Sequence, residues 1–298
     1  YETNSIVENK DKVYEGYAEV LVDDEFVERF YDGEDMFLEQ NMVKENLYPN
    51  QFLLLISSSN PKKTAICRFS EFKSPLKQIK VKDACKSFGI IPRNKEQTFA
   101  YDLLFDDNIP LVSLIGRAGS GKTLMAIAAG LEQAVGFGER KYKKIVVSRP
   151  VQPMGKDIGF LPGTMEEKMG PWLMPIHDNL EFILGNKHQI KSYFEKGQIE
   201  VEALTYIRGR SISNAFIIID EAQNLTAHEV KTIITRVGEG TKVILTGDIE
   251  QIDNIYTNET SNGLTYAIEK FKHAELAGHI TFRKGERSKI ATLASKVL

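Results

Sequence analysis

Short apolar runs alternate with helical patterns over the C-terminal two thirds of the chain. The apolar runs predict six strands, at residues 111–115, 144–148, 199–204, 215–220, 242–246 and 279–282. Apolar residues at helical spacing predict helices at 122–136, 165–184, 228–237, 263–273 and 286–298. Strands that are apolar on both faces and alternate with helices are typical of a mostly parallel sheet covered on both sides. We therefore predict a doubly wound α/β domain, which binds its ligands at the carboxyl ends of its strands.

The first 80 residues follow a different pattern, in which strand-like runs are separated by turn residues. The runs YAEVLV, NQFLLLIS, TAICRF and LKQIKV are bounded by stretches rich in Asn, Pro, Gly and Ser. Runs of this length with such boundaries are typical of β-strands. We therefore predict a small acidic β-rich domain over residues 1–82, followed by the α/β domain over residues 83–298. These patterns do not distinguish a barrel from a sandwich.

The composition adds few constraints, since 42% apolar and 27% charged residues are ordinary for a globular protein. No apolar run approaches the roughly 18 residues of a membrane span, and no signal-like leader opens the chain. Cys67 and Cys85 lack the spacing of a disulfide framework or a zinc site. These features predict no membrane association and a cytoplasmic location. Because the chain begins at Tyr1, we expect it to be a piece of a longer protein.

Charge is unevenly distributed along the chain. The formal net charge is −3, but the first 50 residues contain 14 acidic and 4 basic side chains, so the remainder carries +7. A mildly basic body can present a local basic groove even when the whole chain is slightly acidic. The low net charge therefore does not exclude a nucleic-acid partner.

The first predicted strand of the α/β domain leads into GRAGSGKT, residues 116–123, which matches the pattern G-x-x-x-x-G-K-T. Glycines in this pattern let backbone N–H groups surround a phosphate chain, and the helix that follows adds positive potential. Lys122 is expected to reach the β- and γ-phosphates, and the Thr123 hydroxyl to hold Mg²⁺. The predicted nucleotide-binding residues here are Gly116, Gly119, Ser120, Gly121, Lys122 and Thr123.

A second motif, FIIIDEAQ, ends another predicted strand. Asp220 at the tip of this strand is expected to hold the Mg²⁺ shell, as a Walker B aspartate does. Glu221 follows directly and is the natural general base for a hydrolytic water. An acidic helix cap is the alternative explanation of the pair.

The third motif is TGDIEQID, residues 246–253, after the next predicted strand. It resembles the GDxxQ motif of superfamily 1 helicases, which predicts that Gln251 senses the γ-phosphate. By itself the segment is equally compatible with a polar turn.

Purine recognition is the least specific of these signals. Asn94 and Gln97 lie shortly before the phosphate-binding loop, where a glutamine can hydrogen-bond adenine, although a capped helix beginning near Asn94 explains the same residues. A guanine site needs the motif NKxD, and the nearest match, NKHQ at residues 186–189, ends in glutamine. We therefore predict ATP, with Mg²⁺, as the cofactor.

Several basic residues lie beyond predicted strand ends. Arg149 closes the second strand of the α/β domain and opens a segment rich in Gly and Pro, and Arg287 opens the last predicted helix. We predict that this segment lines a ring and contacts RNA or a neighbouring subunit. The predicted RNA or inter-subunit contacts are Arg149, Lys156, Arg208 and Arg210.

The combination of SRPVQPMGKDIGFLPGTMEEKMGPWLMPIHDNLEF, GRAGSGKT, YIRGRS, IIIDEAQN, TGDIEQID and KGERS resembles the PhoH-like ATPase family over residues 88–298. KGERS and the β-rich preface resemble the longer members, in which a PIN ribonuclease domain comes first. The acidic PIN residues are not recognisable here, so we expect any such domain upstream of Tyr1. The resemblance implies a RecA-like P-loop fold and an ATP-dependent, ring-forming RNA helicase that feeds RNA to the nuclease. It also implies that Arg287 is the arginine finger.

Superfamily 1 motors place ATP between two RecA-like lobes, whereas this chain has a single predicted lobe. A neighbouring subunit is then expected to complete the site, and head-to-tail contacts that close produce a ring. We predict a homo-oligomer, most simply a hexamer, that acts on single-stranded RNA. The alternative is a nucleotide-dependent switch or protein-remodelling ring that binds no nucleic acid.

Overall fold

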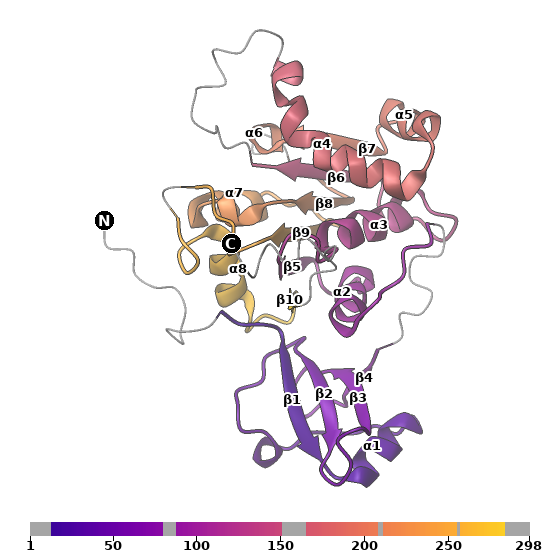
Figure 1. Ribbon diagram of the computed structural model, residues 1–298, viewed down its shortest axis with the longest axis vertical. Coiled ribbons are helices and arrows are strands. Elements are labelled where there is room, and N and C mark those ends of the chain that lie inside the picture. The colour runs from indigo at the N-terminus through magenta and orange to yellow at the C-terminus, as the bar shows by residue number, and fades with distance from the viewer. Residues whose placement is uncertain (1–12, 80–87, 151–164, 208–210, 255–256, 284–298) are drawn as a thin grey trace, which may run out of the picture.

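The computed structural model describes residues 13–79, 88–150, 165–207, 211–254 and 257–283. Two sheets organise this part of the chain, a small four-stranded sheet near the N-terminus and a six-stranded sheet above it in Figure 1. The six strands are β5 (Leu111–Gly116), β6 (Lys144–Arg149), β7 (Ile199–Ala203), β8 (Ala215–Ile219), β9 (Lys242–Gly247) and β10 (Ala277–Phe282). The helices with them are α2 (Lys95–Phe105), α3 (Lys122–Val135), α4 (Met165–Leu184), α5 (Lys187–Glu195), α6 (Leu204–Ile207), α7 (Ala227–Ile234) and α8 (Gly263–Phe271).

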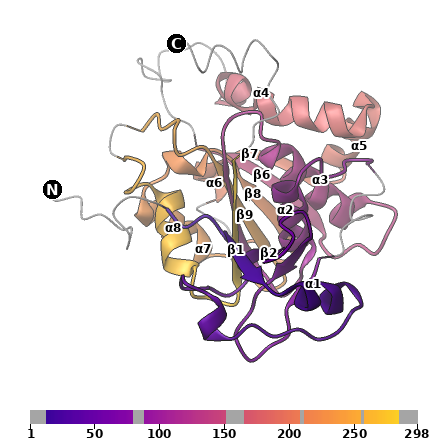
Figure 2. The same cartoon turned by 60° about the horizontal axis from the view of Figure 1, so that its bottom comes forward.

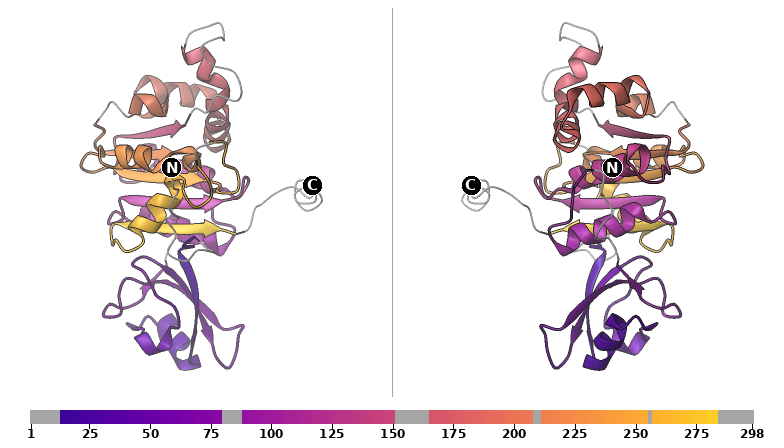
Figure 3. Two further views of the ribbon diagram at one scale, coloured as in Figure 1. Left: turned by 90° about the vertical axis from the view of Figure 1, so that its left-hand side faces the viewer. Right: turned by 90° about the vertical axis from the view of Figure 1, so that its right-hand side faces the viewer.

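The large sheet is parallel throughout, in the order β10-β5-β9-β8-β6-β7. From β5 the chain runs outward to β6 and β7, and from β8 it returns through β9 to β10. Right-handed crossovers in opposite directions place their helices on opposite faces of a sheet. Accordingly α2, α3 and α4 cover one face, and α7 and α8 cover the other, as Figures 1 and 3 show. The predicted doubly wound sheet is confirmed.

Alternation of side chains along the strands supplies both hydrophobic cores. Val112 and Leu114 of β5 pack under α2 and α3, whereas Leu111 and Ile115 join the core under α7 and α8. Successive side chains of a strand point to opposite faces, so a strand buried on both faces is apolar at nearly every position. This is why the strands could be predicted from apolar runs alone.

Helices were harder to predict than strands, and α2 shows why. Its buried residues occupy most of its length, because the helix lies between the two sheets, as seen in Figures 1 and 2. A helix surrounded by protein lacks the polar stripe by which a surface helix is recognised. Helices α5 and α6 were not predicted, and α7 and α8 end three and two residues before their predicted ends. The predicted last helix, 286–298, lies outside the described residues.

The small sheet has the order β1-β2-β3-β4, with β1 (Tyr17–Val22) parallel to β2 (Phe52–Ser57). The antiparallel strands β3 (Thr64–Arg68) and β4 (Lys77–Gln78) complete it. An unpredicted helix, α1 (Asp24–Tyr31), buries Val27 and Phe30 in a separate core with residues of these strands. Within the described residues this sheet is open, with β1 and β4 at its two edges. The predicted boundary between residues 82 and 83 lies outside the described residues.

The small sheet is joined to α2 by apolar and ionic contacts. The ring of Phe52 stacks on Phe99 with their centroids 4.4 Å apart. Arg68 contacts Asp102 at 2.7 Å and also pairs with Asp106, and all three side chains are almost fully buried. Lys77 adds a second cation 2.7 Å from Asp106, and hydrogen bonds from these cations hold the pKa of Asp106 well below its usual range. Removing one partner of this cluster would leave a buried charge unpaired, so substitutions here should weaken the junction between the small sheet and α2.

A buried lysine connects the same C-terminal end of α2 to the large sheet. The Lys242 ammonium lies at the start of β9 and donates hydrogen bonds to the carbonyl oxygens of Leu103 at 2.6 Å and Asp106 at 2.7 Å. Burial lowers its pKa to about 7, from an ordinary value of 10.5. A neutral amine has two N–H donors, so the two carbonyls satisfy it without a charge.

This pKa predicts a pH-dependent stability. Between about pH 7 and 8.5, the unfolded state holds a proton on Lys242 that the folded state progressively loses. The free energy of unfolding is therefore expected to rise with pH in this window, by at most about 1.4 kcal/mol per pH unit. Urea unfolding at several pH values measures the slope. Lys242→Met should reduce it, whereas equal slopes in the two proteins would contradict the assignment.

Candidate functional site

The phosphate-binding loop begins where β5 ends and finishes at the first turn of α3. Gly119 and Gly121 have positive φ angles of 79° and 87°, a conformation that disfavours side chains. A Cβ on Gly116 would lie 2.7 Å from the Ser120 hydroxyl and 2.8 Å from the Phe282 Cβ. Each glycine of the motif is therefore required by backbone conformation or by close packing, and the loop lies at the carboxyl edge of the sheet.

Lys122 and Ser120 of this loop are suited to a polyphosphate. The Lys122 side chain is buried, and its ammonium lies 3.5 Å from the carbonyl oxygen of Arg117 within the same loop. The hydroxyl of Ser120 is fully buried and has no hydrogen-bond partner among the described residues. Such a buried, unpartnered donor fits a ligand that supplies an acceptor. A phosphate chain is a ligand of this kind.

One short hydrogen bond joins the phosphate-binding loop to the DEAQ motif. Thr123 Oγ1 donates to Asp220 Oδ1 at 2.8 Å, and Thr246 Oγ1 donates to the same oxygen at 2.7 Å. Asp220 is buried at the end of β8, and its N–H donates to the carbonyl oxygen of Ser148 on β6. Hydroxyl and carboxylate oxygens are ligands that Mg²⁺ prefers, so the donor set fits the predicted metal.

Glu221 has a backbone conformation that is unusual for any residue other than glycine. Its backbone is left-handed, with φ 54° and ψ 38°. A non-glycine residue in this region costs on the order of 1 kcal/mol or more, and such residues cluster at active sites. Its carboxylate accepts a hydrogen bond from Arg149 Nη2 at 3.2 Å through Oε1 and from Gln223 Nε2 at 2.5 Å through Oε2. The structure thus gives Arg149, which was predicted to contact RNA or a subunit, a partner inside its own chain.

Gln223 is the functional residue that the sequence analysis missed, although it is the last letter of DEAQ. It is fully buried, donates to the Gln251 carbonyl oxygen at 2.9 Å and accepts from the Asp248 N–H at 3.1 Å. A Cβ on Gly247 would lie only 2.4 Å from its amide oxygen, so glycine is needed there. Gln223 therefore connects Glu221 to the TGDIEQID segment.

The TGDIEQID segment also contacts the phosphate-binding loop. Asp248 accepts a hydrogen bond from the Ala118 N–H at 3.0 Å, and the exposed side chains of Glu250 and Arg117 pair at 2.7 Å. Gln251 lies at the same edge with an exposed side chain. The three motifs thus meet at the carboxyl ends of β5, β8 and β9, while sensing by Gln251 stays a prediction.

Asn94 and Gln97, the predicted adenine contacts, have structural partners. Asn94 caps α2 by accepting from the Gln97 N–H at 3.0 Å, which is the alternative that the sequence left open. The buried Gln97 amide accepts from the Arg93 N–H and donates to the Ser120 carbonyl oxygen at 3.1 Å. Gln97 therefore supports the phosphate-binding loop, and adenine contact by either residue stays a prediction. Asn186 of NKHQ likewise caps a helix, α5.

Four of the predicted site residues lie outside the described residues. They are Lys156, Arg208, Arg210 and Arg287.

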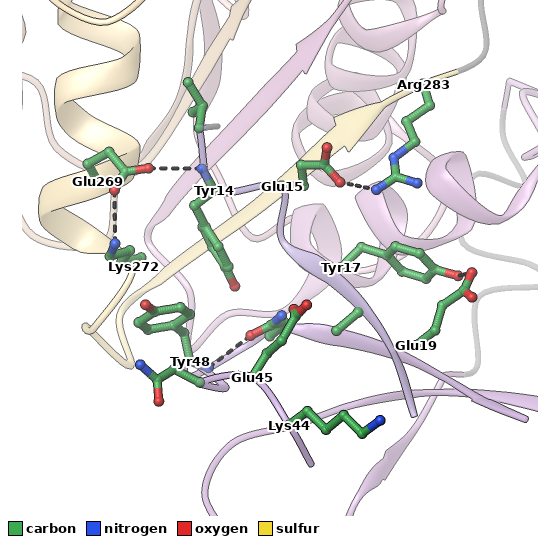
Figure 4. A pocket seen from close by; sticks show the side chains of 14 residues that line it. Tyr14, Glu15, Tyr17, Glu19, Lys44, Glu45, Tyr48, Glu269, Lys272 and Arg283 are labelled. Atoms are coloured by element: carbon green, nitrogen blue, oxygen red, sulfur yellow. Dashed lines mark hydrogen bonds and ion pairs between the residues drawn. The ribbon is translucent and has the colours of Figure 1, made fainter. Parts of the chain in front are cut away.

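A cavity of about 820 Å³ lies away from these motifs, where the small sheet meets α8 and β10 (Figure 4). Two ion pairs join residues that line it, Glu269 with Lys272 at 2.9 Å and Glu15 with Arg283. Its residues come from β1, α8 and the segments next to them, with Arg283 directly after β10, and include none of the phosphate-binding loop. We therefore assign the cavity to the junction of the two sheets and not to the nucleotide.

A doubly wound parallel sheet with this loop, aspartate and threonine defines the chain as a P-loop nucleotide-binding protein. Comparison with family models matches residues 89–297 to the PhoH-like protein family. The chain belongs to that family.

Curated relatives agree with this membership. The chain is 47% identical to Protein PhoH2 of Bacillus subtilis, covering 99% of this chain and 66% of that protein. It is 42% identical to Protein PhoH2 of Mycolicibacterium smegmatis over 71% of this chain and 48% of that protein. The chain therefore spans between about half and two thirds of the length of these relatives.

Solved structures resemble the chain only distantly. Pif1 helicase from Candida albicans matches with 16% identity and a TM-score of 0.35, covering 70% of this chain and 43% of that one. Pif1 helicase from Bacteroides, in complex with ADP-AlF3 and ssDNA, matches with 15% identity and a TM-score of 0.32, covering 67% of this chain and 44% of that one.

Among the described residues, no helix combines the length and hydrophobicity needed to cross a bilayer.

Proposed function

We propose that this chain is the ATPase part of an RNA motor, with Mg²⁺ as its metal. In this proposal Lys122 neutralises the β- and γ-phosphates, and Thr123 and Asp220 hold the metal. Glu221 takes a proton from the attacking water, and Gln251 responds to the γ-phosphate. When bound, Mg²⁺ supplies positive charge at the phosphate oxygens.

The hydrogen bond between Thr123 and Asp220, at 2.8 Å, is the observation that carries the ATPase proposal. These residues are 97 positions apart in sequence, yet they meet where a P-loop protein holds its metal. The adjoining Glu221 favours hydrolysis over binding alone, because a carboxylate beside the metal site can accept the proton of a water.

The RNA substrate and the ring rest on the family and on the single large sheet. The described residues form one parallel sheet of this type, and in this proposal a neighbouring subunit covers the other side of the nucleotide. A head-to-tail ring, which we take as a hexamer, would let an arginine such as Arg287 complete the site in trans. The +7 charge of residues 51–298 is compatible with single-stranded RNA.

The greater length of the relatives leaves room for a further domain. We propose that the ring feeds RNA to a PIN ribonuclease domain upstream of Tyr1, in the cytoplasm. Lys156, Arg208 and Arg210 are proposed RNA or inter-subunit contacts.

An ATPase assay with and without polymers tests the motor. Single-stranded RNA is expected to stimulate ATP hydrolysis at least several-fold, and its binding should weaken steeply as salt increases, because released counterions dominate such affinities. Equal rates with RNA, with DNA and with no polymer would favour the protein-remodelling ring instead. A native mass measurement on the same preparation tests the ring.

A further inference from the structure

The Glu221 carboxylate accepts hydrogen bonds from Gln223 and from Arg149, and these two donors differ in burial. Gln223 is fully buried, and hydrogen bonds with the backbone of Gln251 and Asp248 hold its side chain in place. The side chains of Arg149 and Glu221 are 23% and 28% exposed and meet through one contact at 3.2 Å. A partly exposed ion pair of this kind contributes little to stability, so the loss of the Arg149–Glu221 contact costs little.

The backbone beneath Arg149 is fixed relative to the catalytic edge. Strand β6 pairs with β8 in a register that places Ser148 beside Ile219, and the Ser148 carbonyl oxygen accepts from the Asp220 N–H at 2.8 Å. A change of partner by Arg149 therefore requires movement of its side chain alone.

The γ-phosphate of a bound ATP would lie within reach of this guanidinium. A general base lies about 3 Å from the water it activates, and that water lies about 3 Å from the reacting phosphorus. The phosphate is then about 6 Å from the carboxylate that Arg149 already touches. A planar guanidinium binds phosphate oxygens through parallel hydrogen bonds, which favours the phosphate over the 3.2 Å contact with Glu221.

We infer that Arg149 exchanges partners during the ATP cycle. It pairs with Glu221 when the γ-phosphate is absent and binds the γ-phosphate when ATP is present, which frees one carboxylate oxygen for the attacking water. Gln223 holds the other oxygen throughout. Arg149 is then a residue of the chain's own nucleotide site that distinguishes ATP from ADP. The inference rests on the proposed ATPase function.

A double-mutant cycle on nucleotide affinity tests the exchange. The probes are ADP and the non-hydrolysable β,γ-imido analogue of ATP, each with Mg²⁺. They are measured on the whole chain for the unaltered protein, Arg149→Met, Glu221→Gln and the double variant. Arg149→Met is expected to weaken the triphosphate analogue about tenfold, with ADP unchanged, because a charge-assisted contact to the γ-phosphate is lost. Arg236→Met, which removes an exposed arginine after α7, is the matched control.

The sign of the coupling decides between exchange and a static pair. If Arg149 leaves Glu221 when the triphosphate binds, Glu221→Gln should improve triphosphate affinity more when Arg149 is present than when it is methionine. A static arginine would shield Glu221, so the same substitution would then gain more in the Arg149→Met background. That result, or an equal gain in both backgrounds, overturns the inference.

Two further outcomes separate this inference from the proposed function. Weaker RNA binding by Arg149→Met with unchanged triphosphate affinity would make Arg149 a nucleic-acid contact and overturn the exchange. If the unaltered protein bound neither nucleotide, the proposed function would fail and the inference with it. Normal nucleotide binding with coupling of the opposite sign would overturn the inference and leave the proposed function in place.

Discussion

Replacing Lys122 by alanine is expected to lower ATP turnover by at least about 10²–10³-fold, since the buried cation next to the phosphates is lost. ATP affinity should fall as well, because the ammonium binds the phosphates in the ground state and in the transition state. The side chain lies inside the phosphate-binding loop and makes no buried ion pair among the described residues, so the fold should persist.

Steady-state kinetics and direct nucleotide binding measure the two effects of this substitution. Lys187→Ala is the matched control, since Lys187 is 82% exposed on α5. Its turnover should equal that of the unaltered protein. Turnover within a few-fold of normal in Lys122→Ala would exclude Lys122 from the site.

Replacing Glu221 by glutamine is expected to lower turnover by about 10²–10⁴-fold while ATP stays bound, because an amide cannot accept the proton of the attacking water. The change keeps the size of the side chain and its hydrogen bond with Gln223 Nε2, so the local structure should be preserved. This variant should accumulate with ATP bound.

A single-turnover assay separates binding from hydrolysis in Glu221→Gln. Glu195→Gln, an exposed position on α5, is the matched control and should hydrolyse ATP normally. Rapid turnover in Glu221→Gln would assign the general base to another group.

Much of the site could be predicted because its motifs are local in sequence. The GRAGSGKT segment requires glycine at particular positions for backbone conformations that other residues avoid, and this requirement is visible in the sequence. The carboxyl ends of parallel strands lie at one edge of a sheet, so Asp220 and Gln251 were expected there with Lys122. Apolar runs likewise predicted every strand of the large sheet to within two residues.

The sequence was uninformative where a residue's role depends on partners distant in sequence. The helix cap made by Asn94 was only one of two alternatives, and the contact of Gln97 with the phosphate-binding loop was not foreseen, while adenine contact by either residue stays a prediction. The role of Gln223 depends on residues 25 and 28 positions away, which no local pattern reveals. The open form of the small sheet and its ionic contacts with α2 were also beyond the sequence patterns.

The sequence by itself determined the class of fold, the phosphate-binding loop and the identity of the acidic pair. These properties follow from backbone preferences and apolar periodicity, which act over a few residues. The tertiary structure alone decided the strand order, the burial of α2 between two sheets, and the contact of Arg149 with Glu221. Such contacts join side chains 72 positions apart, and they arise only when packing brings the strand ends together. The regulation proposed for Glu221 therefore belongs to the folded chain and not to any of its motifs.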